Sequence, residues 1–235
     1  MMSIRLLNVF SVGVLGMVLS AAFCDIFWTK KKIFAMAGGV VGILLFQGII
    51  YSVTDLDIVK KLYPLITHIP LTVILCILNR KCVWPTISVL SAYLCCQIRR
   101  WLALLIVFIF SGTPQMQDVV ELAMTLPIIA LLIWLVAPAV RAMSHFPISI
   151  QCLFGLIPAL YYGFDYLTQV YTDLLLQGVL AVAEFMSFVC SVAYLIFVTY
   201  ISKEQQTRSK LEQNQAILNL QIEQAVREIA ALRES

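Results

Sequence analysis

Seven long apolar stretches, separated by short polar connections, account for most of the chain. A helix needs about 20 mostly apolar residues to cross the hydrocarbon core of a bilayer, and every stretch approaches or exceeds that length. Their approximate ranges are 4–27, 33–53, 60–79, 85–112, 119–141, 147–164 and 173–200. The pattern predicts an all-α polytopic membrane protein in which residues 1–200 form a seven-helix transmembrane bundle.

After Tyr200 the pattern changes to a polar segment, residues 201–235, that contains no glycine or proline. Such a segment favours a helix, and apolar side chains recur in it at coiled-coil spacing. Four of them lie seven residues apart and two occupy the alternate position: Leu211, Leu218, Ala225 and Leu232, then Ile222 and Ile229. The spacing predicts a parallel two-stranded coiled coil, and hence a homodimer through a cytoplasmic signalling helix. A solvated helix that pairs with nothing is the alternative.

The polar tail follows directly on the seventh apolar stretch. We therefore expect one continuous helix that leaves the membrane and transmits rotation or displacement of the last span to the cytoplasm. The coiled-coil repeat stops in mid-pattern at Ser235, which predicts that the chain ends before the part that this helix drives.

Composition agrees with a membrane location and limits the possible partners. Hydrophobic residues make up 61% of the chain and charged residues 12%, about half the charged fraction of a typical soluble domain. The net charge is only +3, and no nucleic-acid-binding motif is present, so we expect no nucleic-acid partner. The seven cysteines form no CxxC pair and no cluster with histidine at metal-ligand spacing. Neither a metal site nor a disulfide framework is therefore expected.

Positive charges in the connecting loops set the predicted orientation, because lysine and arginine are enriched on the cytoplasmic side of membrane proteins. With a cytoplasmic C-terminus, the inner side would hold Lys30, Lys31, Lys32, Arg80, Lys81, Arg141 and Lys203. The outer side would hold Arg5, Lys60 and Lys61, and acidic residues that include Asp118 and Glu121. We predict an external N-terminus, a cytoplasmic C-terminus, and a capping box formed by Asp118 and Glu121 at the start of the fifth span.

Two arginines, Arg99 and Arg100, interrupt the fourth apolar stretch. Arg99 would lie about 21 Å along a helix that starts at Pro85, past the midplane of the bilayer. A central arginine costs about 2.5–3.5 kcal/mol on insertion scales. Consecutive side chains point about 100° apart, so one arginine is expected to reach the outer headgroups and the other to face an anion inside the bundle. Glu184 is the first candidate for that anion and Asp165 the second.

Two interpretations of this arginine pair remain open. In the first, a structural ion pair between Arg99 or Arg100 and Glu184 fixes the fourth span against the seventh. In the second, these residues belong to an outward-facing ligand pocket in which a ligand carboxylate competes with Glu184. The rim of that pocket would comprise Tyr161, Tyr162, Asp165 and Tyr171. Trp101 is placed to stack on one of the arginines.

His68 and Cys76 in the third span suggest a membrane cysteine peptidase as a further possibility. Eight residues along a helix leave two side chains about 80° apart, and no third group is evident to orient the histidine. We therefore expect no catalytic residue in the chain. His68 is predicted to be a buried polar side chain that bonds to a carbonyl group.

Three segments of the chain share a pattern of residue types with a known family. They are "FDYLTQVYTDLL" from Phe164, "EFMSFVCSVAYLIFVTY" from Glu184, and the tail that ends in "REIAALRES". Together they resemble the membrane sensor half of GHKL-type sensor histidine kinases from Firmicutes and related bacteria, which include the accessory-gene-regulator peptide receptors. In that family the tail leads into a phosphoacceptor-histidine segment and an ATP-binding domain. The resemblance implies a bacterial cell membrane. It also implies that ATP, Mg²⁺ and a response regulator would be bound only through a kinase domain absent from this chain.

The sequence as a whole thus predicts the input module of a two-component sensor kinase. With no sizeable outer domain, its signal would be a small peptide or a lipophilic molecule, recognised in the bilayer or at its outer edge. Two alternatives belong to other classes. One is a small transporter or channel-like subunit with the Arg/Glu pair on its path, and the other is a membrane-anchored dimeric scaffold.

Overall fold

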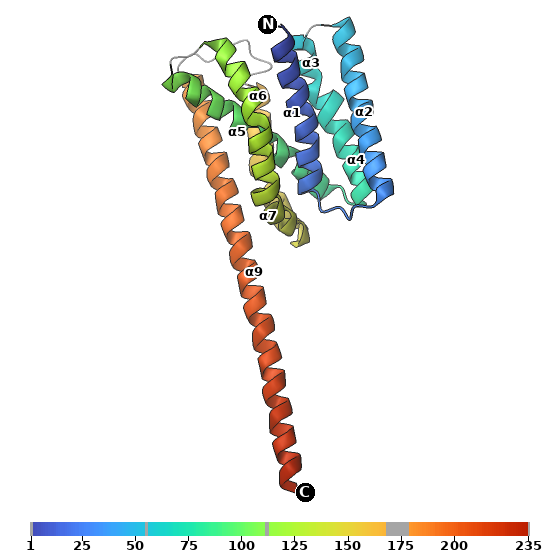
Figure 1. Ribbon diagram of the computed structural model, residues 1–235, viewed down its shortest axis with the longest axis vertical. Coiled ribbons are helices and arrows are strands. Elements are labelled where there is room, and N and C mark those ends of the chain that lie inside the picture. Colours follow the sequence, from blue (N-terminus) through green and yellow to red (C-terminus); the bar gives the residue numbers. More distant parts are fainter. Residues whose placement is uncertain (1, 55, 111–112, 168–178, 235) are drawn as a thin grey trace.

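The computed structural model describes residues 2–54, 56–110, 113–167 and 179–234, and these residues are helical apart from short connections (Figure 1). The helices are α1 (Met2–Phe23), α2 (Lys30–Val53), α3 (Leu56–Tyr63), α4 (Ile69–Asn79), α5 (Val83–Ile109), α6 (Pro114–Leu131), α7 (Ala137–Ala142), α8 (Ile148–Asp165) and α9 (Val179–Glu234). A π-helical turn, Pro64–His68, joins α3 to α4, and another, Leu132–Val136, joins α6 to α7.

Seven of the resulting helical segments are long and apolar enough to cross a membrane. They are Leu6–Phe23, Lys30–Val53, Lys61–Asn79, Val83–Ile109, Gln115–His145, Ile148–Asp165 and Phe185–Ala225. The predicted all-α architecture and its seven apolar helices are therefore confirmed. Together they indicate a multi-pass membrane protein.

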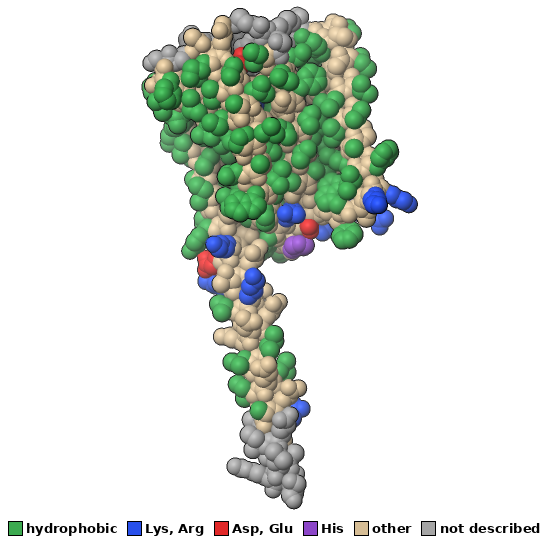
Figure 2. Space-filling view, in the orientation of Figure 1, with side chains coloured by type: hydrophobic (Ala, Val, Ile, Leu, Met, Phe, Trp, Pro, Cys, Tyr) green, Lys and Arg blue, Asp and Glu red, His purple; other side chains and the backbone are tan. Residues whose placement is uncertain are grey.

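Side chains are distributed in the bundle as a bilayer requires, with polar groups inside and apolar groups outside. Asn8, Gln47, Arg99, Glu121 and Asp165 are buried, whereas large apolar side chains cover the outer surface (Figure 2). On the face shown, lysine and arginine gather where α9 leaves the bundle, here called the tail end, and along the tail. The N-terminus lies at the opposite end, here called the N-terminal end (Figure 1).

Helix α5 is the centre of the bundle and packs against α1, α4, α6 and α8. Small side chains allow this close approach, because Ser88, Ser91, Ala92, Cys95 and Cys96 are all buried in its middle. The helix is also where both arginines lie, so its surroundings decide what each of them contacts.

Helix α9 runs without a break from Val179 to Glu234 over 56 residues, a length of about 84 Å at the α-helical rise. Its first part packs against α7 and α8, and the remainder extends beyond the bundle (Figure 1). The predicted continuity through Tyr200 is therefore confirmed.

Pairing of the tail stays a prediction. Of the coiled-coil positions, Leu211, Leu218, Ile222 and Ala225 are exposed, and the side chains of Ile229 and Leu232 lie outside the described residues. The structure adds one feature that the repeat did not single out. Ile217 and Leu220 are exposed as well, on the side of the helix away from the repeat.

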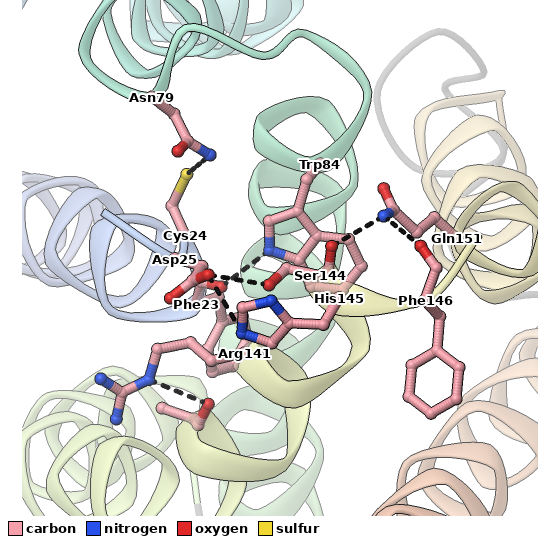
Figure 3. A network of polar contacts seen from close by, with 11 residues as sticks. Phe23, Cys24, Asp25, Asn79, Trp84, Arg141, Ser144, His145, Phe146 and Gln151 are labelled. Carbon is pink, nitrogen blue, oxygen red and sulfur yellow. Dashed lines mark hydrogen bonds and ion pairs between the residues drawn. The ribbon is translucent and has the colours of Figure 1, made fainter. Parts of the chain in front are cut away.

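A polar network closes the tail end of the bundle (Figure 3). The indole Nε1 of Trp84 on α5 donates to the Phe23 carbonyl oxygen at the end of α1, at 3.2 Å. Asn79 at the end of α4 donates from Nδ2 to the Cys24 Sγ atom at 3.5 Å. Burial raises the pKa of the Cys24 thiol to about 12, so this sulfur stays protonated and unreactive at neutral pH.

The same network includes the connection between α7 and α8 (Figure 3). Asp25 Oδ2 accepts a hydrogen bond from Ser144 Oγ at 3.0 Å and lies 3.4 Å from His145 Nε2. Gln151 Nε2, in the first turn of α8, donates to the carbonyl oxygens of Ser144 and Phe146, each at 2.8 Å. These bonds fix α8 relative to α1 at the end where the tail emerges.

Close packing of α8 on α5 depends on Gly155, where an added Cβ would lie 2.6 Å from Cγ1 of Ile87. Gly155→Val should lower the free energy of unfolding by about 1–3 kcal/mol through overpacking, measured by denaturation in mixed detergent micelles. Gly163→Val in the same helix is the matched control, because a Cβ there meets no atom within 4 Å. Equal losses for both variants, or no rescue of Gly155→Val by Ile87→Ala, would contradict this packing.

Candidate functional site

Arg99 lies at the centre of a buried polar cluster formed by α1, α5 and α6. Its Nη1 donates to Asn8 Oδ1 at 2.5 Å and to Thr125 Oγ1 at 3.4 Å. The same nitrogen lies 3.4 Å from Glu121 Oε2, and both side chains of this ion pair are nearly inaccessible. Asn8 Nδ2 and Gln117 Nε2 donate to the two Glu121 carboxylate oxygens at 2.9 and 3.1 Å. A buried charge pair needs such additional bonds to offset its desolvation.

The start of α6 explains why Glu121 is inside the bundle. Thr113 caps the helix, since its Oγ1 accepts from the Met116 N–H at 3.4 Å, and Pro114 occupies the first turn. Glu121 is therefore about 10 Å along the helix. The predicted capping box of Asp118 and Glu121 is wrong, because the helix begins at Pro114.

The carboxylate beside Arg99 is that of Glu121, whereas the sequence analysis named Glu184 first for the arginine pair. The side chain of Glu184 lies outside the described residues, although its backbone belongs to α9. The contact between α5 and α9 at this level is aromatic. Trp101 stacks on Phe188, with ring centroids 5.3 Å apart, and meets Phe185 edge-on at 5.8 Å. The sequence analysis predicted that Trp101 stacks on an arginine; in the structure its ring packs against Phe185 and Phe188 instead.

A second buried cluster lies between α5 and α8. Tyr93 donates its hydroxyl to Asp165 Oδ2, and Gln97 Nε2 donates to the same oxygen at 3.4 Å. Arg100 interacts electrostatically with this carboxylate. Tyr93, Gln97 and Arg100 follow one face of α5 at helical spacing, and Asp165 is buried at the last position of α8. The second candidate anion, Asp165, thus belongs to the Arg100 side of α5.

Aromatic rings extend this second cluster toward α3. The His68 Nδ1 atom lies 2.7 Å from the Tyr162 hydroxyl, so its partner is a phenol and the predicted bond to a carbonyl is wrong. The rings of Tyr63, Tyr93 and Tyr162 surround His68 at centroid distances of 5.1, 5.4 and 5.3 Å. Tyr166 packs against Tyr162 at 4.8 Å. We call Tyr93, Gln97, Asp165, His68 and Tyr162 the aromatic–acid cluster.

A small groove lies at the N-terminal end, between α1, α2 and α3. Leu6, Val9, Phe10 and Val59 form its apolar wall, with Gln47, Tyr51 and Tyr63 as polar members. Tyr63 belongs both to the groove and to the ring contacts with His68.

The structure thus divides the predicted pocket between two faces of α5. Asp165 and Tyr162 come together with Tyr93, Gln97 and His68, three residues that the sequence analysis did not assign to the pocket. Arg99 belongs instead to the cluster with Glu121. Tyr161 is buried nearby in α8, and Tyr171 lies outside the described residues.

The histidine and cysteine of the third span, considered above as a peptidase pair, have different partners. Cys76 Sγ lies 3.7 Å from the Cys82 carbonyl oxygen, whereas His68 bonds to Tyr162, so the structure gives the pair separate partners. Within the described part of the chain, no three His, Cys, Asp or Glu side chains are placed to hold a metal ion. What the arrangement offers is two sets of buried polar contacts on different faces of α5.

Comparisons with protein-family models, with curated proteins and with solved structures find no match to this chain.

Glu121→Gln should lower the free energy of unfolding by about 3–5 kcal/mol, because it leaves Arg99 buried without a counter-charge. Detergent-micelle denaturation measures the loss. The double variant Arg99→Gln/Glu121→Gln removes both charges and should recover most of the lost stability. A double variant whose loss equals the sum of the two single losses would contradict the ion pair.

Proposed function

We propose that the chain is the membrane-embedded input module of a two-component sensor histidine kinase. It receives a signal at the outer face or within the bilayer and passes it along α9 to a cytoplasmic kinase domain of the GHKL type. The N-terminus is external and the C-terminus cytoplasmic, consistent with the lysine and arginine side chains at the tail end. ATP, Mg²⁺ and the response regulator act only at that kinase domain.

The observation that carries this proposal is the unbroken helix from the bundle into the tail. A helix of 56 residues without a break moves as one body over the distance from the bilayer to the cytoplasm. Rotation or displacement of its first half therefore reaches its last half. A protein that only anchors or transports does not need this property.

Two sets of contacts connect the polar clusters to α9. Trp101 follows directly on Arg99 and Arg100 and stacks on Phe188 of α9. At the tail end, the α8 residue Phe154 packs against Tyr194 of α9, with ring centroids 5.4 Å apart. Asp165 lies on the same helix as Phe154. A change at the aromatic–acid cluster thus has a route to α9 through both α5 and α8.

The input surface comprises the groove and the aromatic–acid cluster, and the ligand is a small peptide or a lipophilic molecule. Differential affinity for two helix arrangements is all that such a switch requires. The tail pairs with its copy as a coiled coil, and the exposed side chains of Leu211, Leu218 and Ile222 form the apolar seam of the dimer.

Cysteine cross-linking in native membranes tests the dimeric signalling helix. In a variant without the native cysteines, Leu218→Cys and Ile222→Cys should form disulfide-linked dimers on mild oxidation, because both lie on the seam. Leu220→Cys is the matched control, since it is similarly exposed but lies on the other side of the helix, and it should cross-link several-fold more slowly. Equal rates at the three positions, or no dimer at any, would overturn the pairing.

A second arm of the same experiment tests transmission. Asp165→Asn removes the charge that Tyr93, Gln97 and Arg100 share, and it should change the cross-linking rate of Leu218→Cys at least twofold. Lys31→Gln, at an exposed position in the first turn of α2, serves as the control. Identical cross-linking rates of Leu218→Cys alone, with Asp165→Asn and with Lys31→Gln would count against transmission from the cluster to the tail.

A further inference from the structure

Pro158 in the middle of α8 leaves one backbone carbonyl without its helical partner. In an α-helix the N–H of residue 158 would donate to the carbonyl oxygen of residue 154, but proline has no N–H. The Phe154 carbonyl oxygen is therefore available, and Phe154 is buried in the bundle. A carbonyl group in such surroundings needs another donor, because water is excluded from the hydrocarbon region.

The missing donor comes from α9. The hydroxyl of Tyr194 donates a hydrogen bond to the Phe154 carbonyl oxygen. The two rings also pack against each other at 5.4 Å, and Trp84 of α5 packs against Phe154 at 5.8 Å. Tyr194 thus contacts α8 through both its ring and its hydroxyl. Its partner Phe154 also packs against Trp84, which bonds to the Phe23 carbonyl oxygen in the tail-end network.

We propose that the Tyr194–Phe154 hydrogen bond is a latch that fixes the rotation and axial position of α9 against the bundle. The bond is directional, and it joins a side chain of α9 to a single backbone atom of α8. Rotation of α9 by a fraction of a turn would break it and leave a buried carbonyl unsatisfied. The latch therefore gives α9 one preferred setting, and Pro158 is the reason that α8 offers an acceptor there.

Only the consequence of the latch rests on the proposed function. That consequence is that breaking the bond changes the rotation and axial position of the signalling helix. Its existence is a separate matter that can be tested without any signal. A double-mutant cycle between Tyr194 and Pro158 isolates it, because Pro158→Ala supplies an N–H to the Phe154 carbonyl from within α8. The hydroxyl of Tyr194 is then no longer needed.

Tyr194→Phe should raise the unfolding equilibrium constant about fivefold, the usual effect of losing one hydrogen bond. Denaturation of the full chain in detergent micelles measures this change. In the Pro158→Ala background the same change should have an effect below twofold. Tyr200→Phe is the control, since this exposed tyrosine lies on α9 six residues further along. Equal effects of Tyr194→Phe in both backgrounds would overturn the latch.

The distance between α8 and α9 is a second measurement, which can be made even if Pro158→Ala does not fold. Spin labels are placed on the native exposed cysteines Cys152 of α8 and Cys190 of α9, and the other cysteines are replaced. Tyr194→Phe should broaden or shift the α8–α9 distance distribution, and Tyr200→Phe should not. A distribution unchanged by Tyr194→Phe would overturn the latch. Either negative result leaves the proposed function intact, because that proposal is decided by cross-linking in the tail.

Discussion

A buried guanidinium group needs charged or polar partners, and those of Arg99 come from two other helices of the bundle. Glu121 on α6 provides the charge and Asn8 on α1 bonds to both partners. Three helices are thereby joined at one point near the N-terminal end. The Coulombic and hydrogen-bond energy of this cluster offsets the cost of placing an arginine among apolar side chains. With that face of α5 occupied, its other polar face is left to α8, where Asp165 meets Tyr93 and Gln97.

This division gives the two clusters different roles. The Arg99 cluster joins α1, α5 and α6, and its main effect is to stabilise the arrangement of these helices. The aromatic–acid cluster includes a histidine, and Tyr63, which packs against that histidine, lines a groove at the N-terminal end. Its contacts also lie on the two helices that touch α9 through Trp101 and Phe154. It is therefore the cluster that we propose as the input surface.

The seven apolar helices and the continuity of α9 were predictable, because long apolar runs and a tail without breakers leave a chain few alternatives in a bilayer. The partner of Arg99 was missed because Asp118 was read as a helix cap, which placed Glu121 in the first turn of the helix, at the membrane surface. Thr113 followed by Pro114 is a helix-start signal that would have moved the boundary. Sequence also shows that Pro158 frees a carbonyl group, but only the packing of α9 on α8 reveals Tyr194 as its donor. Such pairings depend on helix rotation, which hydropathy does not encode.

The central claim is that α9 is one rigid helix from the bilayer into the tail, and a distance across the junction tests it most directly. Spin labels at Cys190 and at Asn219→Cys, in a chain without other cysteines and diluted with unlabelled protein, lie on nearly the same side of the helix. The account predicts a narrow distance distribution centred about 44 Å, from 29 residues at 1.5 Å each. A broad distribution centred well below 40 Å would mean that the helix bends between bundle and tail, and the account would then be wrong.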